Sequence, residues 1–438
     1  MKAQSIVFFI ISLLMMVSIN SGSAQRFEIW SEIESSGFEP IKLAINQVSI
    51  RGEASPEDSG IAEKIYRVLN DDLDFHFVLD TVMIDPFILK LWEKDEPDLF
   101  IWKQMGADHV LNVTAEFSEE KIRLDYSLQN LRLQSFRETA SDSYRLDRQY
   151  WRYLAHTISD EVVERLTGYK GIFRTRLAFI TAKTGNKEVY ISDYDGYNVQ
   201  PVTNNDSINI SPVWDAKSES ILYTSWKRGQ PDIWEADLKD SEHKLIASYP
   251  GINSAPAISP NNREMVLTLS KDGNAELYLT DRKGKIKRRL TNSFAIETSP
   301  AFAPSGREIA FTSDRTGGRQ IYMMDTEGLN VRRITYLGSM NESASISPDG
   351  SKIAYVTIGP RGSFDICVAD INGSNYKIIT DSGFNENPRW APDGLHLIYS
   401  SQWGDRSVLY ISDYLGLKKR LVCNQPGSSN PCWSGYLR

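Results

Sequence analysis

A short motif with a proline at its second position recurs through the second half of the chain at a constant interval. Successive second positions lie 44 residues apart, with 43 for the last interval. The copies are Ser211–Trp214, Ala255–Ile258, Ser299–Phe302, Ser343–Ile346 (which lacks the proline), Asn387–Trp390 and Asn430–Trp433. Because periods of about 20–50 residues are typical of solenoids, propellers and arrays, this half of the chain is predicted to be one repetitive architecture.

A second motif repeats in step with the first: a mostly aromatic position followed three residues later by aspartate. The pairs are Tyr190/Asp193, Trp234/Asp237, Tyr278/Asp281, Tyr322/Asp325, Cys367/Asp370 and Tyr410/Asp413. Each period contains four short segments rich in β-branched and aromatic residues, separated by turn sequences such as Pro348-Asp349-Gly350. In one unit these segments are 299–302, 308–313, 320–324 and 332–335. Four strands per period indicate a β-propeller blade, and the lack of helical periodicity excludes a helical solenoid.

The two ends of the repeat region indicate how the ring closes. The first unit starts at 176–180, which matches the second strand of the later units, and it lacks a first strand of its own. The chain ends with a sixth first strand, at 430–433, that no further unit follows. We therefore expect the C-terminal strand to complete the first blade, which gives six blades and no open sheet edge.

The N-terminus has the order of a secretory signal peptide. Lys2 precedes an apolar run at 6–19, and small residues follow at 21–24. The run is shorter than the roughly 20 residues of a spanning helix. We expect cleavage after Ala24, with an uncleaved anchor as the alternative. No cysteine follows the site, so no lipid anchor is expected there, and no later segment is expected to span a membrane.

Residues 25–170 lack the period and mix two kinds of pattern. Strands are predicted at 41–50, 75–79, 110–117, 121–128 and 135–144, and helices at 54–69, 86–92, 97–105 and 147–166. Ser55 and Pro56 are typical of a helix start, and Gly168 of a helix end. The sequence thus predicts an α+β two-domain protein: a signal peptide (1–24), an N-terminal α/β sandwich (25–170) and a six-bladed β-propeller (171–438).

Composition and motifs disfavour several kinds of chemistry. The formal charge of −8 argues against nucleic-acid binding. There is no His-Glu-x-x-His, no phosphate-binding glycine loop and no Gly-x-Ser-x-Gly, the last of which a propeller-gated serine peptidase would need. With three cysteines and five histidines, neither a disulfide scaffold nor a multi-zinc protein is indicated. We expect no catalytic, cofactor or metal site.

Three features each allow two interpretations. The repeated aspartates either hold a ring of cations or accept hydrogen bonds within their own turns. The repeated aromatic residues Trp214, Phe302, Trp390 and Trp433 either form a ligand platform or fill the wedges between blades. Cys423 and Cys432 either form a disulfide in an oxidising compartment or remain free thiols. For the first two features the structural interpretations are favoured, namely hydrogen bonds within the turns and packing between the blades.

The loops that lead into the proline-containing strands are expected to line one mouth of the propeller. Glu297, Glu342 and Glu386 occupy related places in three of these loops. Loops held by a rigid scaffold commonly carry binding residues. The alternative is a solvated polar rim with no specific partner.

At several places the sequence resembles the TolB family, the exported propeller component of the Tol–Pal system of Gram-negative envelopes. The resemblance is densest at the domain junction, and the matching stretches are 151–162, 166–176, 192–198 and 430–437. It implies a non-enzymatic, monomeric periplasmic scaffold with no cofactor, which supports outer-membrane integrity and envelope constriction at cell division. Its implied partners are TolA and the lipoprotein Pal. The competing hypothesis is a sugar- or peptide-processing propeller enzyme.

The resemblance also implies which residues bind. Carried over by motif, the Pal-contacting positions are Ile252, Asn253, Ala255 and Thr298, to which blade symmetry adds Glu297 and Glu342. TolA contact is implied for the mature N-terminal segment, here Phe27, Glu28, Ile29, Trp30, Ser31, Glu32 and Ile33. Its alternation would let it join a partner sheet as a strand, or it is an edge strand of the first domain. The sequence departs from the family at Ser434-Gly435, where the family usually has proline.

Overall fold

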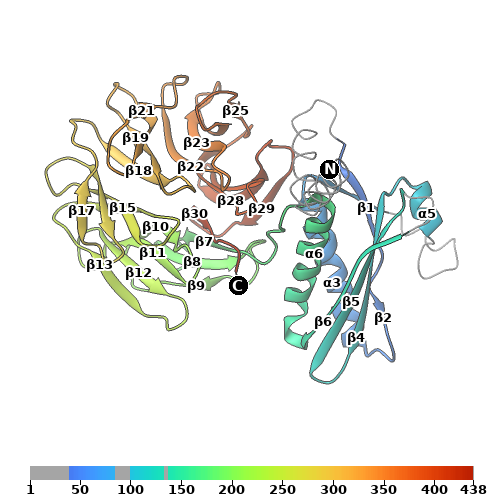
Figure 1. Cartoon of the computed structure of the whole chain (residues 1–438). Helices are drawn as coiled ribbons and strands as arrows, with labels where there is room; N and C mark the ends of the chain where they lie inside the picture. Colours follow the sequence, from blue (N-terminus) through green and yellow to red (C-terminus); the bar gives the residue numbers. More distant parts are fainter. Residues whose placement is uncertain (1–38, 84–98, 133–136, 438) are drawn as a thin grey trace, which may run out of the picture. The chain divides into compact units, whose positions relative to one another are not determined.

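The computed structural model describes residues 39–83, 99–132 and 137–437 (Figure 1). They belong to two compact units, and the division falls between Gly171 and Ile172. The expected signal peptide, the segment 27–33 and the expected helix at 86–92 lie outside the described residues. Among the helices within those ranges, none is both long enough and apolar enough to cross a membrane.

The first unit is a mixed sheet with two long helices on one face (Figure 1). The strand order is β3-β1-β4-β5-β6, and β2 also pairs with β4. Strand β1 is parallel to β3 and β4, whereas β4, β5 and β6 are antiparallel. The strands are β1 (Ile41–Ile45), β2 (Ser49–Ile50), β3 (Leu79–Val82), β4 (His109–Phe117), β5 (Lys121–Asn130) and β6 (Arg137–Asp147). The helices are α3 (Pro56–Phe75), α5 (Leu99–Gln104), the 3-10 turn η1 (Arg148–Tyr150) and α6 (Trp151–Thr167).

Helix α3 starts where the sequence predicts but ends later. The Ser55 side chain accepts from the Asp58 backbone N–H and the Asp58 carboxylate accepts from the Ser55 N–H, which forms a capping box. The helix continues to Phe75 because Leu73 and Phe75 extend its buried face. The strand expected at 75–79 was therefore wrong, and the strand in this region is β3 (Leu79–Val82).

Two other expectations for this unit needed correction. The strand predicted at 41–50 is broken after Ile45, because Asn46 uses its side chain to accept from Trp102 Nε1 at 2.9 Å and to donate to Asn112 at 2.6 Å. The helix predicted from residue 147 begins with the turn η1 and becomes α-helical at Trp151. Its end was predicted correctly, since Gly168 has a φ of 73° and donates to the Glu164 carbonyl.

The second unit is a six-bladed β-propeller, as the period predicts, and each blade is a four-stranded antiparallel sheet (Figure 1). The first, innermost strands are β30 (Ser429–Trp433), β10 (Asn209–Trp214), β14 (Asn253–Ile258), β18 (Glu297–Phe302), β22 (Asn341–Ile346) and β26 (Phe384–Trp390). The second strands are β7 (Arg176–Thr181), β11 (Ser220–Ser225), β15 (Glu264–Leu269), β19 (Glu308–Ser313), β23 (Lys352–Ile358) and β27 (His396–Trp403).

The outer half of each blade completes the sheet. The third strands are β8 (Glu188–Asp193), β12 (Asp232–Asp237), β16 (Glu276–Asp281), β20 (Gln320–Asp325), β24 (Phe364–Asp370) and β28 (Arg406–Asp413). The fourth strands are β9 (Gln200–Pro201), β13 (His243–Ala247), β17 (Ile286–Arg289), β21 (Arg332–Arg333), β25 (Lys377–Ile378) and β29 (Lys419–Cys423). In this order the blades are numbered 1 to 6, from the one that contains β30 and β7.

The C-terminal strand closes the ring in the way that the sequence predicts. Strand β30 pairs antiparallel with β7, with Ser429 opposite Ile180 and Cys432 opposite Ala178. The last residues of the chain thus supply the first strand of blade 1. Closure removes the free sheet edges that an open arc of blades would present.

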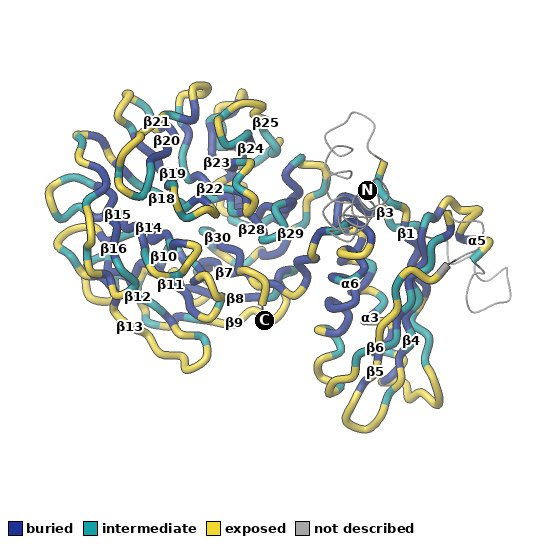
Figure 2. The backbone as a smooth tube through the Cα atoms, viewed as in Figure 1, coloured by how far each residue is buried: buried dark blue, intermediate teal, exposed yellow. Residues whose placement is uncertain are grey.

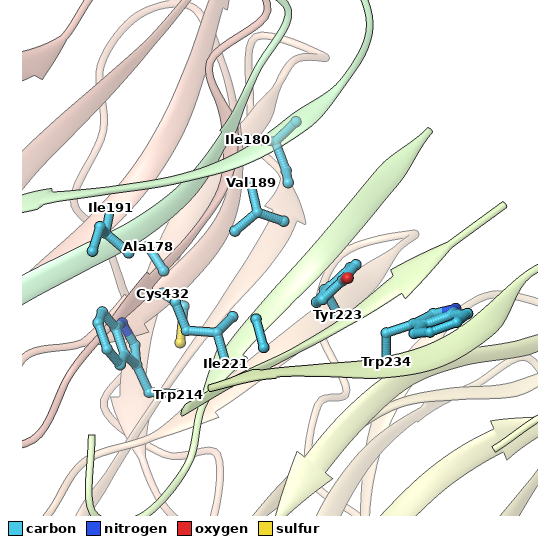
Figure 3. Packing of buried hydrophobic residues seen from close by; sticks show 10 residues of the cluster. Ala178, Ile180, Val189, Ile191, Trp214, Ile221, Tyr223, Trp234 and Cys432 are labelled. Carbon is cyan, nitrogen blue, oxygen red and sulfur yellow. The ribbon is translucent and has the colours of Figure 1, made fainter. Parts of the chain in front are cut away.

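Hydrophobic side chains fill the wedges between neighbouring blades. In the cluster between blades 1 and 2, Trp214 and Ile221 pack with Ala178 and Cys432 (Figure 3). Figure 2 shows the middle of the blades buried and the connecting turns exposed. Trp214, Trp390 and Trp433 are buried and Phe302 packs on the next cluster, which supports the wedge interpretation over a ligand platform.

The repeated aspartates act within their own turns. Each of Asp237, Asp281, Asp325 and Asp413 accepts backbone N–H groups of the following hairpin, and Asp193 and Asp370 accept the amides of Asn198 and Asn375. No group of three or more potential metal ligands occurs within residues 39–83, 99–132 and 137–437. The hydrogen bonds support the interpretation that these aspartates stabilise their own turns. All three cysteines are buried free thiols, so Cys423 and Cys432 are not bridged.

Candidate functional site

The loops that enter the innermost strands gather at one end of the propeller, because all six of these strands start from the same end of their blades. We call this end the entry mouth. It carries many of the large apolar side chains that the structure leaves in solvent: Ile208, Ile252, Phe294, Ile296, Tyr336, Leu337 and Phe384. Exposed apolar patches on a soluble protein commonly mark interaction sites.

The first residue of each of the innermost strands β10, β14 and β22 is buried and holds the preceding loop in place. Asn253 accepts from the Tyr249 N–H at 2.8 Å and donates to the Tyr249 carbonyl at 2.7 Å. Its amide also reaches the carbonyl oxygens of Pro231 and Gly251. Asn209 and Asn341 take the same position in their blades and bond to their own loops. Asn253 therefore shapes the mouth and does not itself face solvent.

In blade 4, Glu297 occupies the equivalent buried position as the first residue of β18. Its carboxylate accepts from Ser293 at 2.7 Å, from Ser313 at 3.1 Å and from the Arg315 guanidinium at 2.8 Å. The register places Glu297 opposite Ser313, as it places Asn253 opposite Leu269. The sequence-based prediction that Glu297 is equivalent to Glu342 and Glu386 is therefore wrong by one position, and the equivalent residue is Thr298. A shift of one residue along a strand turns the side chain to the opposite face.

Glu342 and Glu386 are at equivalent places in neighbouring blades, paired with Val356 and Ser400. Glu342 forms an ion pair with Arg319 at 2.6 Å, and 19% of its side chain is exposed. Partial desolvation and the nearby Glu342 carboxylate raise the pKa of Glu386. The mouth therefore has an acidic sector between blades 5 and 6 and a basic flank formed by Arg315 and Arg319 in the preceding hairpin.

The other predicted residues surround the same opening. Ile252 is 47% exposed, and its backbone N–H donates to Ser270 Oγ at 2.8 Å. Thr298 is partly exposed and pairs with Thr312. Ala255 lies deeper, at a β-bulge with a φ of 49°, and lines the central channel. The structure thus brings Ile252, Ala255, Thr298 and Glu342 to one mouth and buries Asn253 and Glu297 beneath it.

The sequence analysis missed the most exposed side chains of this mouth. Phe294, Tyr336, Leu337 and Phe384 are in solvent, and none of them is among the binding residues expected from the sequence. The sequence does contain a signal for three of them: Phe294, Tyr336 and Leu337 are apolar residues in connecting loops, outside the alternation of the strands, whereas Phe384 is the first residue of β26. Such residues lack a core to fill, so a partner surface is a reason for their presence.

Comparison with protein families identifies both parts of the chain. A model of the TolB beta propeller domain matches residues 163–437. A model of the TolB amino-terminal domain matches residues 31–135. The two matches together cover the second unit and most of the first.

Individual relatives agree with these matches. The chain is 32% identical over 210 residues to the Tol-Pal system protein TolB of Geobacter sulfurreducens, a match that covers 47% of each protein. It is 46% identical over 80 residues, 18% of each protein, to that of Desulfosudis oleivorans. These matches span less than half of the curated relatives' length. The crystal structure of TolB from Acinetobacter baumannii superposes with a TM-score of 0.80 at 26% identity, over 91% of this chain and 97% of that one.

Proposed function

This chain belongs to the TolB family, and from that membership we propose that it is a non-enzymatic periplasmic scaffold of the Tol–Pal system. It binds Pal through the entry mouth and TolA through the mature N-terminal segment, as a monomer. In this role it supports outer-membrane integrity and envelope constriction at division. Relatives named as Tol-Pal system proteins support the assignment.

The observation that carries the proposal is the ring of exposed apolar side chains on a closed scaffold. Ile252, Phe294 and Tyr336 are exposed in the loops and Phe384 at the start of β26, and buried polar residues such as Asn253 hold the bases of these loops in place. A preorganised surface loses little conformational entropy on binding. Aromatic side chains of this kind are typical binding hot spots.

The polar residues of the mouth supply specificity. We propose that Ile252, Ala255, Thr298 and Glu342 contact Pal directly, with Glu342 held in place by Arg319 at 2.6 Å. Asn253 and Glu297 are buried and act by positioning the loops. The acidic sector of Glu342 and Glu386 favours a partner that presents basic groups there, because complementary charge sets orientation and association rate.

Calorimetric titration of the chain from residue 25 with soluble Pal tests the site. Saturable binding is expected, with loss in Thr298→Arg because a long cation then fills the opening. A matched control is Leu329→Arg, since Leu329 is exposed in a hairpin at the opposite end of the blades. Equal binding by wild type and Thr298→Arg would move the site away from the entry mouth. No binding by any form would reopen the enzyme hypothesis.

The N-terminal segment is tested separately. We propose that residues 27–33 add as a strand to TolA, and that engagement of one partner alters access to the other. Deletion of residues 25–36 is expected to abolish TolA binding and to leave Pal affinity unchanged or tighter. A large loss of Pal affinity in this variant would contradict the coupling.

A further inference from the structure

The central channel of the propeller contains a cavity of about 70 Å³. All six bulge residues of the innermost strands line it, one from each blade: Ser211, Ala255, Ser299, Ser343, Asn387 and Asn430. These side chains are small or are uncharged amides. Since roughly 10–15 Å³ of such space already holds one water, the cavity has room for several waters or for one small ion.

One charged side chain, Arg389, is among the residues that line this cavity. The strand register shows which residues of the other blades are equivalent to Arg389. In blade 6 Arg389 pairs with Ile398, and in blade 2 Val213 pairs with Leu222 in the same way. The same position in the remaining blades holds small residues, namely Ala257, Ala301, Ser345 and Cys432. Arg389 thus puts a long cation at a place where the other five blades have short uncharged side chains, of which Val213 also lines the cavity.

The guanidinium of Arg389 has little to bind in the protein. Its Nη1 donates to the carbonyl of Pro388 at 2.9 Å, the residue before it in the chain. Within the described residues no ion pair involves Arg389, and no aspartate or glutamate is among the residues that line the cavity. Arginine offers five N–H donors in a planar fork, so most of its hydrogen-bonding capacity faces the channel.

An unpaired cation in a confined space is costly. Burial lowers the pKa of the Arg389 guanidinium, and the nearby titratable group is the Cys432 thiol, itself buried with a raised pKa. Charged groups held away from bulk water are normally paired. A bound anion would account for both the space beside the guanidinium and the missing counter-charge.

We propose that the cavity is an anion site, in which Arg389 binds one small free monovalent anion, best a carboxylate of about the size of acetate. A planar carboxylate matches the guanidinium fork with two parallel hydrogen bonds. The cavity volume excludes large organic anions. The bound anion would neutralise the channel behind the entry mouth, independently of any protein partner.

Thermal unfolding of the chain from residue 25, followed at the transition of the propeller, tests the site at constant ionic strength in sodium acetate and in sodium gluconate. Gluconate has the same charge and is too large for the cavity. Acetate is expected to raise the wild-type midpoint by about 2 °C or more over gluconate, since a ligand of the native state stabilises it. Arg389→Met should show no such difference. Arg263→Met removes an exposed cation and should respond like wild type.

A direct readout keeps the test decisive if Arg389→Met does not fold. Wild-type crystals soaked in bromide are expected to show an anomalous peak within hydrogen-bond distance of the Arg389 guanidinium. No peak there, equal wild-type midpoints in both salts, or the same acetate response in Arg389→Met would each overturn the proposal.

Discussion

The indole Nε1 of Trp433 donates to the Oγ1 of Thr175 at 2.8 Å, across a sequence separation of 258 residues. Both residues are buried. Thr175 precedes the first propeller strand, and Trp433 ends the last one. This bond therefore joins the two ends of the ring where strand β30 completes blade 1.

Trp433→Phe should weaken ring closure. The variant keeps an aromatic ring in the wedge but leaves the Thr175 hydroxyl without its indole donor, which costs about 1–2 kcal/mol of unfolding free energy. Urea unfolding followed by far-ultraviolet circular dichroism measures the change. Trp403→Phe is the matched control, because Trp403 is substantially exposed, and it should change stability by less than about 0.5 kcal/mol. Equal effects of the two substitutions would contradict this role.

The propeller blades could be predicted from the sequence because the same motifs recur in every blade. The 44-residue period fixed the number of blades, and an unmatched first strand at 430–433 revealed the closure. The break after Ile45 could not be seen, since it depends on the contact of Asn46 with Trp102. The burial of Glu297 was missed because a one-residue error in strand phase reverses the side chain. Exposed loop residues such as Phe294 have no period that would reveal them.

Gly196→Ala should destabilise the propeller far more than Gly185→Ala. Both glycines have positive φ, 83° and 99°, where any other residue is strained. A Cβ on Gly196 would lie 1.9 Å from the Val422 carbonyl oxygen in blade 6, whereas a Cβ on Gly185 would meet nothing within 4 Å. We expect a loss of roughly 3 kcal/mol for Gly196→Ala and about 1 kcal/mol for Gly185→Ala. Chemical denaturation measures both, and similar losses would mean that the blades separate easily at this contact.

His109 should make the first unit less stable in acid. Burial lowers the pKa of His109 to about 4, against the opposing effect of Asp108 and with a contribution from Arg132. The unfolded chain binds this proton near pH 6.5, so above that pH the buried neutral His109 causes no loss of folding stability. The stability is lost as the pH falls from about 6.5 to 4, by up to about 3 kcal/mol. Urea unfolding at pH 7 and pH 4.5 should show a smaller loss for His109→Gln than for wild type. Identical losses would contradict this assignment.

The three thiols should react slowly in the folded protein and completely after unfolding. All are buried and free, and burial raises the pKa of the Cys367 thiol to about 11. The Cys367 thiolate is therefore scarce at pH 8, and its fraction rises as the pH approaches 11, while burial shields the other two thiols from the reagent. Ellman's reagent should detect far less than one thiol per native chain and three in urea without reductant. One thiol in urea would mean that Cys423 and Cys432 are bridged in the purified protein.

Ile252→Ala and Asn253→Ala should separate contact from positioning at the entry mouth. Ile252 is 47% exposed, so its truncation should change unfolding free energy by less than about 0.5 kcal/mol. As a proposed hot spot it should weaken binding to soluble Pal about tenfold.

Asn253→Ala leaves the Tyr249 N–H and carbonyl without their buried partner, which should cost about 2 kcal/mol of stability. Its effect on Pal should appear mainly as a less favourable binding entropy, since the loop must then be ordered on binding. Calorimetry and denaturation of both variants give the four values needed. A stability loss in Ile252→Ala, or unchanged stability in Asn253→Ala, would reverse the roles assigned to these neighbouring residues.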